Sequence, residues 1–324
     1  MKLATYHDGS RDGQLVVVSR DLSQAHYASH IANRLQQVLD DWNYLAPQLQ
    51  DLSDALQAGK ARHAFAFDPT QCMAPLPRAY QCVTAYAYPS HLELVPSPGA
   101  DTPEPRSAQR ASDALLGPCA DIVAPSAAGA VDFGAGLAVL TDDLPAQCSA
   151  ERALDGVRLL LLVNEVTLRD GPQPGVCASA FAPLAVTPDE LGPAWSRGRL
   201  HLPLQVSWNG RKVGMCDAGA DMGWHFGKLL AHLCQTRRLG AGSLVCSGPV
   251  SNKGQERRGR VEWPQGYSSI AERRARHVRQ DGQPDTPFLA AGDTLHIEMK
   301  DQAGTSVFGA IAQTVVATAG ATAQ

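Results

Sequence analysis

Residues 131–139 have the sequence Val-Asp-Phe-Gly-Ala-Gly-Leu-Ala-Val. Apolar residues dominate this short run, which indicates a buried β-strand. Side chains two positions apart lie on one face of a strand, so Asp132, Gly134 and Gly136 are expected to share a face. Because glycine has no side chain, that face offers a single carboxylate.

Three segments farther along the chain accompany this strand. Residues 164–170 are Asn-Glu-Val-Thr-Leu-Arg-Asp, residues 239–242 are Leu-Gly-Ala-Gly, and residues 247–252 are Ser-Gly-Pro-Val-Ser-Asn. In this order and spacing, the four segments resemble the fumarylacetoacetate hydrolase family, and the resemblance extends over nearly the whole chain. It implies an α+β fold that is mainly β, with a small N-terminal α+β unit followed by a mixed β-sandwich or roll. It also implies hydrolysis of a carbon–carbon bond beside a carbonyl, assisted by a divalent metal ion.

The first part of the chain predicts the small α+β unit from its own pattern. Residues 14–18 favour a strand, and residues 44–57, which end shortly before Gly59, favour a helix. We expect this N-terminal domain to span residues 1–72 and the hydrolase-like domain to span residues 73–324. An earlier helix is predicted by apolar residues at three- and four-residue spacing, namely Ile31, Leu35, Val38, Leu39 and Trp42.

Strands and turns dominate the second part of the chain. Asn209-Gly210 predicts a β-hairpin over residues 202–213, and residues 294–299 and 306–316 predict another. Residues 96–114 are rich in proline, alanine and serine without periodicity, so they are expected to form a mobile loop. Helices are expected to begin at Thr187 and to cover residues 221–236, the second with an apolar face of Met222, Phe226, Leu229, Leu230 and Leu233.

The resemblance places a catalytic pair in the chain. His91 matches the family's general-base histidine, and Glu272 matches the acidic residue that orients it. A neutral imidazole can take a proton from water near neutral pH, which is why such hydrolysis uses histidine. Arg169, in the segment at 164–170, matches an arginine beside the metal strand and is the expected substrate-binding residue.

The metal site implied by the resemblance is incomplete. The family holds Mg²⁺ or Ca²⁺ with four carboxylates, because these ions prefer hard oxygen ligands. The corresponding positions here are Thr84, Gly134, Gly136 and Glu165, of which only Glu165 is acidic. A shifted ion held by Glu165 and Asp132 with water molecules is one alternative, and the absence of any metal is the other.

Other expected groups of the same pocket are also missing. The family's lysine falls near Val176, in a segment shortened between residues 170 and 178, and a substrate-side threonine is replaced by Pro249. The basic run expected after the histidine segment is Pro-Ser-Pro-Gly at residues 96–99. Without the metal and the lysine, little remains to stabilise an enolate.

Composition limits the partners. A net charge of −4, with 19% charged and 44% hydrophobic residues, is ordinary for a globular protein and gives no reason to expect nucleic acid. No apolar signal core or membrane-length run is present, and the eight cysteines include no Cys-x-x-Cys pair, so we expect a cytoplasmic protein with reduced thiols. By resemblance it is a homodimer whose substrate is a small dicarbonyl acid.

Some of these features also have a plain structural interpretation. Glu93 is expected to be a solvated strand residue, and Glu272 lies in a strand-like stretch. The basic residues between 253 and 279 are expected to lie on a solvated β surface, although they could also attract an anionic partner.

Three functional hypotheses remain. The first is a hydrolase for a fumarylacetoacetate-like or acylpyruvate-like acid, with His91 as base and Glu272 orienting it. The second is a catalytically silent relative that binds a small acid or a partner protein. The third is a metal-free reaction that uses His91 and Glu272 alone.

Overall fold

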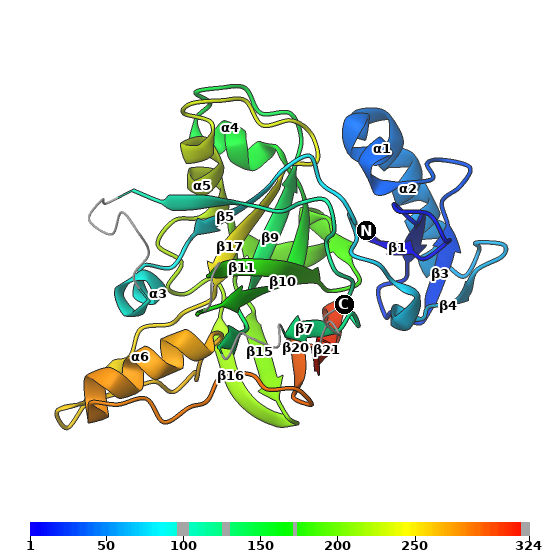
Figure 1. Ribbon diagram of the computed structural model, residues 1–324. Helices are drawn as coiled ribbons and strands as arrows, with labels where there is room; N and C mark the ends of the chain where they lie inside the picture. Colours follow the sequence, from blue (N-terminus) through cyan, green and yellow to red (C-terminus); the bar gives the residue numbers. More distant parts are fainter. Residues whose placement is uncertain (96–103, 125–129, 171–173, 319–324) are drawn as a thin grey trace, which may run out of the picture.

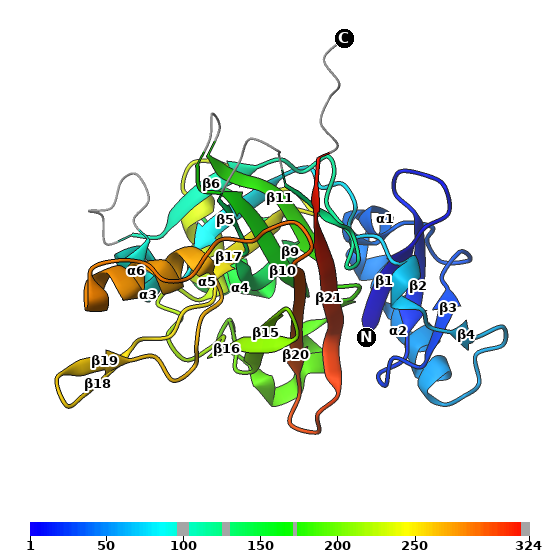
Figure 2. The ribbon, with the colours of Figure 1, turned by 60° about the horizontal axis from the view of Figure 1, so that its bottom comes forward.

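Two β-sheets form most of the structure (Figures 1 and 2). The computed structural model describes residues 1–95, 104–124, 130–170 and 174–318. In chain order the elements are β1 (Lys2–Tyr6), β2 (Gln14–Val18), β3 (Gln24–Tyr27), α1 (Leu35–Asp40), α2 (Trp42–Gln57), β4 (Phe65–Ala66), η1 (Pro69–Gln71), β5 (Cys82–Tyr86), α3 (Pro89–Leu94), β6 (Arg106–Arg110), β7 (Ile122–Ala124), β8 (Val131–Asp132), β9 (Ala135–Thr141), α4 (Ala150–Asp155), β10 (Val157–Leu168), β11 (Gly175–Phe181), β12 (Ala185–Val186), η2 (Pro188–Ala194), β13 (Trp195–Ser196), β14 (Arg199–Leu200), β15 (Pro203–Trp208), β16 (Arg211–Asp217), α5 (Phe226–Leu233), β17 (Leu244–Pro249), β18 (Gln255–Arg257), β19 (Arg260–Glu262), α6 (Ile270–Asp281), β20 (Thr294–Lys300) and β21 (Ser306–Ala317).

The larger sheet joins the N-terminal unit to the rest of the chain. Its strands follow the order β4-β3-β2-β1-β12-β10-β9-β17-β5-β6, with β8 and β11 also paired to β10, and the second sheet follows β16-β15-β20-β21-β7. The predicted mainly β architecture with a small N-terminal α+β unit is therefore confirmed. Strand β1 pairs with β12 through Lys2 and Val186, so hydrogen bonds cross from the first unit into the second.

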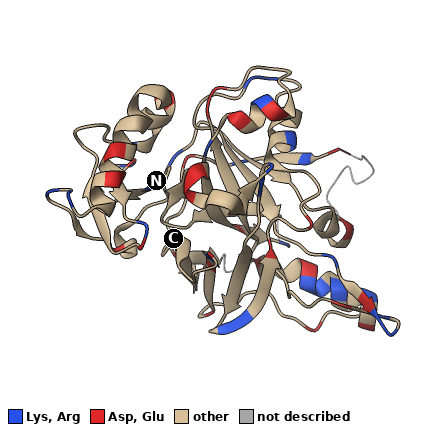
Figure 3. Ribbon diagram, turned by 180° about the vertical axis from the view of Figure 1, so that it is seen from behind, with Lys and Arg blue, Asp and Glu red and all other residues tan. Residues whose placement is uncertain are grey.

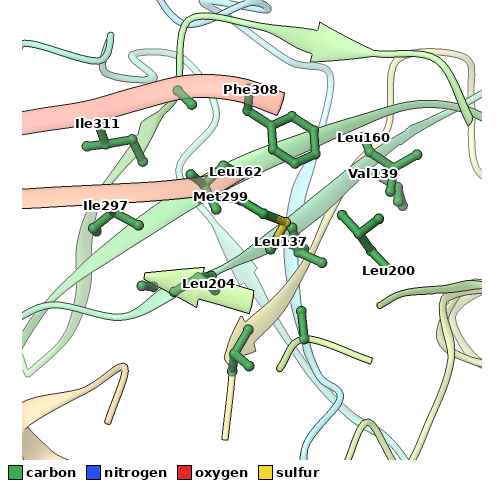
Figure 4. Close-up of a cluster of buried hydrophobic side chains, with 14 of the residues drawn as sticks. Leu137, Val139, Leu160, Leu162, Leu200, Leu204, Ile297, Met299, Phe308 and Ile311 are labelled. Atoms are coloured by element: carbon green, nitrogen blue, oxygen red, sulfur yellow. The ribbon is translucent and has the colours of Figure 1, made fainter. Parts of the chain in front are cut away.

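Strand β10 is the centre of the core because both of its faces are buried. Leu160 and Leu162 pack against the second sheet, where Figure 4 shows them with Leu137, Ile297 and Phe308. The alternate residues on the opposite face belong to the cluster formed with helices α1 and α2 of the N-terminal unit. Burial on both faces explains why residues 157–163 form a nearly unbroken apolar run rather than an alternating one.

Local turn chemistry predicted several elements correctly. The hairpin at Asn209-Gly210 is β15–β16, the second hairpin is β20–β21, and β2 covers the predicted residues 14–18. The expected helix over 221–236 is the shorter α5, although all five residues of its predicted apolar face are buried. The helix after Thr187 is the 3-10 segment η2, which is kinked at Gly192.

The strand predicted over 131–139 is confirmed except at residues 133–134, which separate β8 from β9. Three other expectations about secondary structure are wrong. Glu93 lies in helix α3 rather than in a strand, and Glu272 lies in the first turn of helix α6. The loop expected over 96–114 contains strand β6, although residues 96–103 lie outside the described part of the chain.

Within the part of the chain that the structure describes, no helix is long and apolar enough to cross a membrane.

Candidate active site

A cavity of about 380 Å³ opens where β5, β6, β10 and β11 meet helix α3. Among the described residues that line it, Glu165 is the single carboxylate and there are three arginines. Basic side chains therefore outnumber acidic ones among the described lining residues. Its described lining is Tyr86, His91, Val95, Arg106, Ser107, Ala108, Arg110, Glu165, Thr167, Arg169, Gly175, Val176 and Pro249.

The predicted pair of His91 and Glu272 is brought together at this cavity. His91 Nδ1 lies 3.0 Å from Glu272 Oε2, and both side chains are buried. Because Nδ1 is held by the carboxylate, any proton transfer to a molecule in the cavity would use His91 Nε2. The two residues come from helices α3 and α6, which pack against each other.

Glu272 is fixed by two further contacts that the sequence reasoning missed. Its Oε1 accepts a hydrogen bond from Ser251 Oγ at 2.9 Å and forms an ion pair with Arg276, one helical turn later. Arg276 is itself buried and stacks over the ring of Trp263. Burial lowers the pKa of Arg276, and the Glu272 carboxylate opposes that shift. The spacing of four residues between Glu272 and Arg276 was the available signal, because it pairs side chains on a helix.

Thr84 and Glu165, two of the positions that the resemblance singles out, also meet. Thr84 Oγ1 and Glu165 Oε1 form a short hydrogen bond, and both residues are buried. Strands β9 and β17 lie between their strands in the sheet, and three strand spacings amount to about 14 Å in a flat sheet. The contact therefore requires the sheet to curl, and the register shifts in β10 and β17 provide local irregularities that favour such twisting.

The two glycines of residues 131–139 are closely packed. A Cβ atom on Gly136 would lie 2.3 Å from the carbonyl oxygen of Gly248. One on Gly134 would lie 3.0 Å from the Glu165 carbonyl oxygen and 3.2 Å from Pro249 Cγ. Main chain and proline thus fill the space that side chains at these positions would need.

Asp132 lies at the N-terminus of helix α6. Its Oδ1 accepts from the backbone of Ile270, and its Oδ2 accepts from Ser269 Oγ, the backbone of Ala271 and the guanidinium of Arg169. The helix dipole and the arginine both stabilise a carboxylate there. Oδ2 is thereby fully used and Oδ1 accepts one hydrogen bond, so Asp132 is held by the start of α6 and by Arg169.

The residues present do not fit a divalent metal ion. Glu165 is the only acidic residue among the four positions at which the resemblance implies ligands, and Asp132 is committed to α6 and Arg169. Across the described residues, no three acidic, histidine or cysteine side chains gather in a group that could hold a metal. Val176 and Pro249 line the cavity where the resemblance implies a lysine and a threonine.

Glu165 is buried beside the cavity. Burial raises the pKa of its carboxyl above the usual value of 4.5, while the hydrogen bond from Thr84 and the nearby charges of Arg110 and His91 act in the opposite direction. The carboxyl is consequently harder to ionise than an exposed glutamate.

Arg106 and Arg110 are site residues that the sequence reasoning missed, because their segment was expected to be a loop. Both lie on β6, and their even spacing puts them on one face of the strand, with Ala108 between them. The basic residues between 253 and 279 were expected on a solvated β surface. They lie mainly on helix α6 and on the small β18–β19 hairpin (Figure 3).

Comparison with known proteins identifies both parts of the chain. Residues 1–78 match the family model described as fumarylacetoacetase N-terminal domain 2, and residues 81–316 match that of the fumarylacetoacetate hydrolase C-terminal domain. No curated protein matches the chain.

Solved structures share the fold over almost the full length. Maleylpyruvate hydrolase from Sphingobium sp. SYK-6, in complex with manganese(II) and pyruvate, has a TM-score of 0.67 at 15% identity, covering 98% of this chain and 99% of that one. Fumarylacetoacetate hydrolase from Exiguobacterium antarcticum gives 0.66 at 16%, and 5-carboxymethyl-2-hydroxymuconate delta-isomerase from Mycobacterium smegmatis gives 0.61 at 16%, with the same coverage of 98% and 99%. At these identities the likeness concerns the fold.

Proposed function

This chain belongs to the fumarylacetoacetate hydrolase family, and we propose that its cavity binds the anion of a small dicarbonyl acid without the metal-assisted cleavage typical of the family. The observation that carries the proposal is the charge of the cavity, which has three arginines and one buried carboxylate among its described lining residues. Arginine is well suited to carboxylates because its planar donors match their two oxygens. The pyruvate bound by the Sphingobium relative makes oxo acids the natural probes.

A metal-dependent reaction is disfavoured by the packing of the two glycines. Two of the four implied ligand positions have no side chain, and the neighbouring backbone leaves little room for one. A metal ion would otherwise supply several kcal/mol of charge stabilisation to the developing enolate. The proposal is therefore that of a small-acid-binding relative of the hydrolases.

A second candidate is metal-free hydrolysis, which the contact of 3.0 Å between His91 and Glu272 favours. The pair would orient the imidazole as a general base toward the cavity. Its activity would be measured as loss of acetylpyruvate absorbance in the presence of chelator, and it would disappear in His91→Gln.

The first experiment is calorimetric titration of chelator-treated full-length protein with pyruvate and acetylpyruvate. We expect both anions to bind, and binding to be unchanged by millimolar Mg²⁺ or Mn²⁺. Pyruvamide, which lacks the carboxylate charge, is the matched control and should not bind. If neither acid binds, or if binding requires the ion, the proposal is wrong.

A further inference from the structure

Arg110, which lines the cavity, is held in a defined orientation by two hydrogen bonds. Its Nε donates to Thr84 Oγ1 at 2.9 Å, and one of its terminal nitrogens, Nη2, donates to Tyr86 Oη at 3.0 Å. Thr84 and Tyr86 alternate along β5 and so lie on the same face of that strand. The guanidinium is thus anchored by two hydroxyls of the neighbouring strand.

The direction of these hydrogen bonds is fixed by chemistry. An arginine can only donate, so the Thr84 hydroxyl accepts from Arg110 and is left to donate its own proton to Glu165. Arg110, Thr84 and Glu165 therefore form a chain in which the positive charge lies one hydroxyl away from the carboxylate. Thr84 and Glu165 are two of the four positions at which the resemblance implies metal ligands, so the guanidinium lies beside the place of the missing ion.

The contacts also determine which part of Arg110 can bind a ligand. The Nε and Nη2 donors that bond Thr84 and Tyr86 form one edge of the planar group. The other edge, formed by Nη1 and the second hydrogen of Nη2, has the two parallel donors that match a carboxylate. Its described contact is a long one, from Nη1 to the carbonyl oxygen of Gln109 at 3.5 Å.

The charge of Arg110 is less compensated than that of Arg169 or Arg276. Arg169 forms an ion pair with Asp132, and Arg276 forms one with Glu272. The partners described for Arg110 are two hydroxyls and a carbonyl, and no carboxylate lies within ion-pair distance of it among the described residues.

We propose that Arg110 takes the place of the metal ion in this chain. It binds the carboxylate of a small oxo acid through the edge formed by Nη1 and Nη2. The inference rests on the proposed function, because it assigns the cation that this function requires. An ion held by four carboxylates is exchanged for a guanidinium held by two hydroxyls, and binding no longer depends on a dissociable cation. Gly134 and Gly136 provide no ligands for an ion, and the positive charge of Arg110 on β6 would replace that ion.

The test compares Arg110→Gln and Arg110→Lys with Arg106→Gln, which removes one arginine from the same strand and cavity. Binding of pyruvate and acetylpyruvate to chelator-treated protein is measured by calorimetry. We expect Arg110→Gln to weaken binding by roughly 10- to 100-fold, as for a lost charged hydrogen bond. Arg110→Lys should bind more tightly than Arg110→Gln but more weakly than the unaltered protein, since lysine keeps the charge but lacks the two parallel donors. Arg106→Gln should weaken binding less, by roughly threefold, because the proposal gives this arginine no direct contact with the carboxylate.

The outcomes separate the inference from the function on which it rests. If the unaltered protein binds the acids and Arg110→Gln binds them equally well, or if Arg106→Gln loses as much affinity, Arg110 is not the cation of the site and the function stands. If the unaltered protein binds neither acid, the proposed function and the inference about Arg110 are both wrong. Should Arg110→Gln fail to fold, Tyr86→Phe removes one anchoring hydroxyl and keeps the charge. It is expected to weaken binding severalfold, and unchanged affinity would overturn the inference.

Discussion

Glu272 contacts both His91 and Arg276, and its removal should affect stability as well as geometry. Glu272→Gln leaves Arg276 buried without its counter-charge, and such unpaired charges cost about 3–5 kcal/mol. We therefore expect the free energy of unfolding, measured with urea, to fall by about 3 kcal/mol. Glu93→Gln, an exposed substitution on the facing helix, is the control and should change it little. A loss below about 1 kcal/mol in Glu272→Gln would contradict the ion pair.

Glu165 should make the stability of the protein depend on pH. Because burial raises the pKa of this carboxyl on folding, the folded protein holds its proton more tightly than the unfolded chain. The stabilising contribution is complete below the ordinary value of 4.5 and is lost as the pH rises through the raised pKa. Glu165→Gln cannot ionise. Its free energy of unfolding should therefore rise relative to that of the unaltered protein as the pH increases from 4.5 to the raised pKa.

Urea unfolding of both proteins over a series of pH values measures this difference. Each tenfold change in acid constant between the folded and unfolded states corresponds to about 1.4 kcal/mol. A difference between Glu165→Gln and the unaltered protein that does not grow with pH would show that Glu165 ionises as readily folded as unfolded.

At the scale of secondary-structure elements, strand β9 packs closely against the backbone at Gly248. Gly136→Ala would push its Cβ against the Gly248 carbonyl at 2.3 Å, and such overpacking costs about 1–3 kcal/mol. Gly134→Ala is the matched variant, with its nearest contact at 3.0 Å, and should cost less. Urea unfolding of the two variants tests the order.

The same packing predicts the outcome of an attempt to rebuild the metal site. Introducing Thr84→Asp, Gly134→Glu and Gly136→Glu together would place a long side chain where the Gly248 carbonyl lies. We expect this triple variant to be destabilised rather than to gain an ion. If Gly136→Ala is as stable as the unaltered protein, the backbone at Gly248 yields easily and this expectation is wrong.

Elements set by local chemistry were predictable from the sequence, whereas those set by distant partners were not. The Asn209-Gly210 turn defines its hairpin from adjacent residues alone. Strand β6, with the sequence Arg-Ser-Ala-Gln-Arg, lacks the branched and aromatic residues that favour strands, and it is a strand because β5 supplies its hydrogen bonds. Its two arginines were missed for that reason.

The candidate site shows the same division. His91 and Glu272 were found through their flanking motifs, and Thr84 with Glu165 through the register of the resemblance, although the latter pair is 81 residues apart in the chain. The role of Asp132 was not predictable from strand alternation, because the backbone groups that it caps lie 138 and 139 residues away at the start of α6.

At the scale of the whole molecule, ligands that bind only the folded protein must raise its stability, and this distinguishes an anion site from a metal site. The gain follows the logarithm of ligand concentration over dissociation constant and reaches about 4 kcal/mol at a thousandfold excess. A micromolar metal site would therefore be obvious in thermal unfolding with millimolar ion. We expect Mg²⁺, Mn²⁺ and Ca²⁺ to leave the melting temperature where a salt of equal ionic strength leaves it, and acetylpyruvate to raise it even with chelator present. A specific rise with any of the three ions would mean that Glu165 recruits a cation despite Arg110, because the other described carboxylate considered for that role, Asp132, is already held by helix α6 and Arg169.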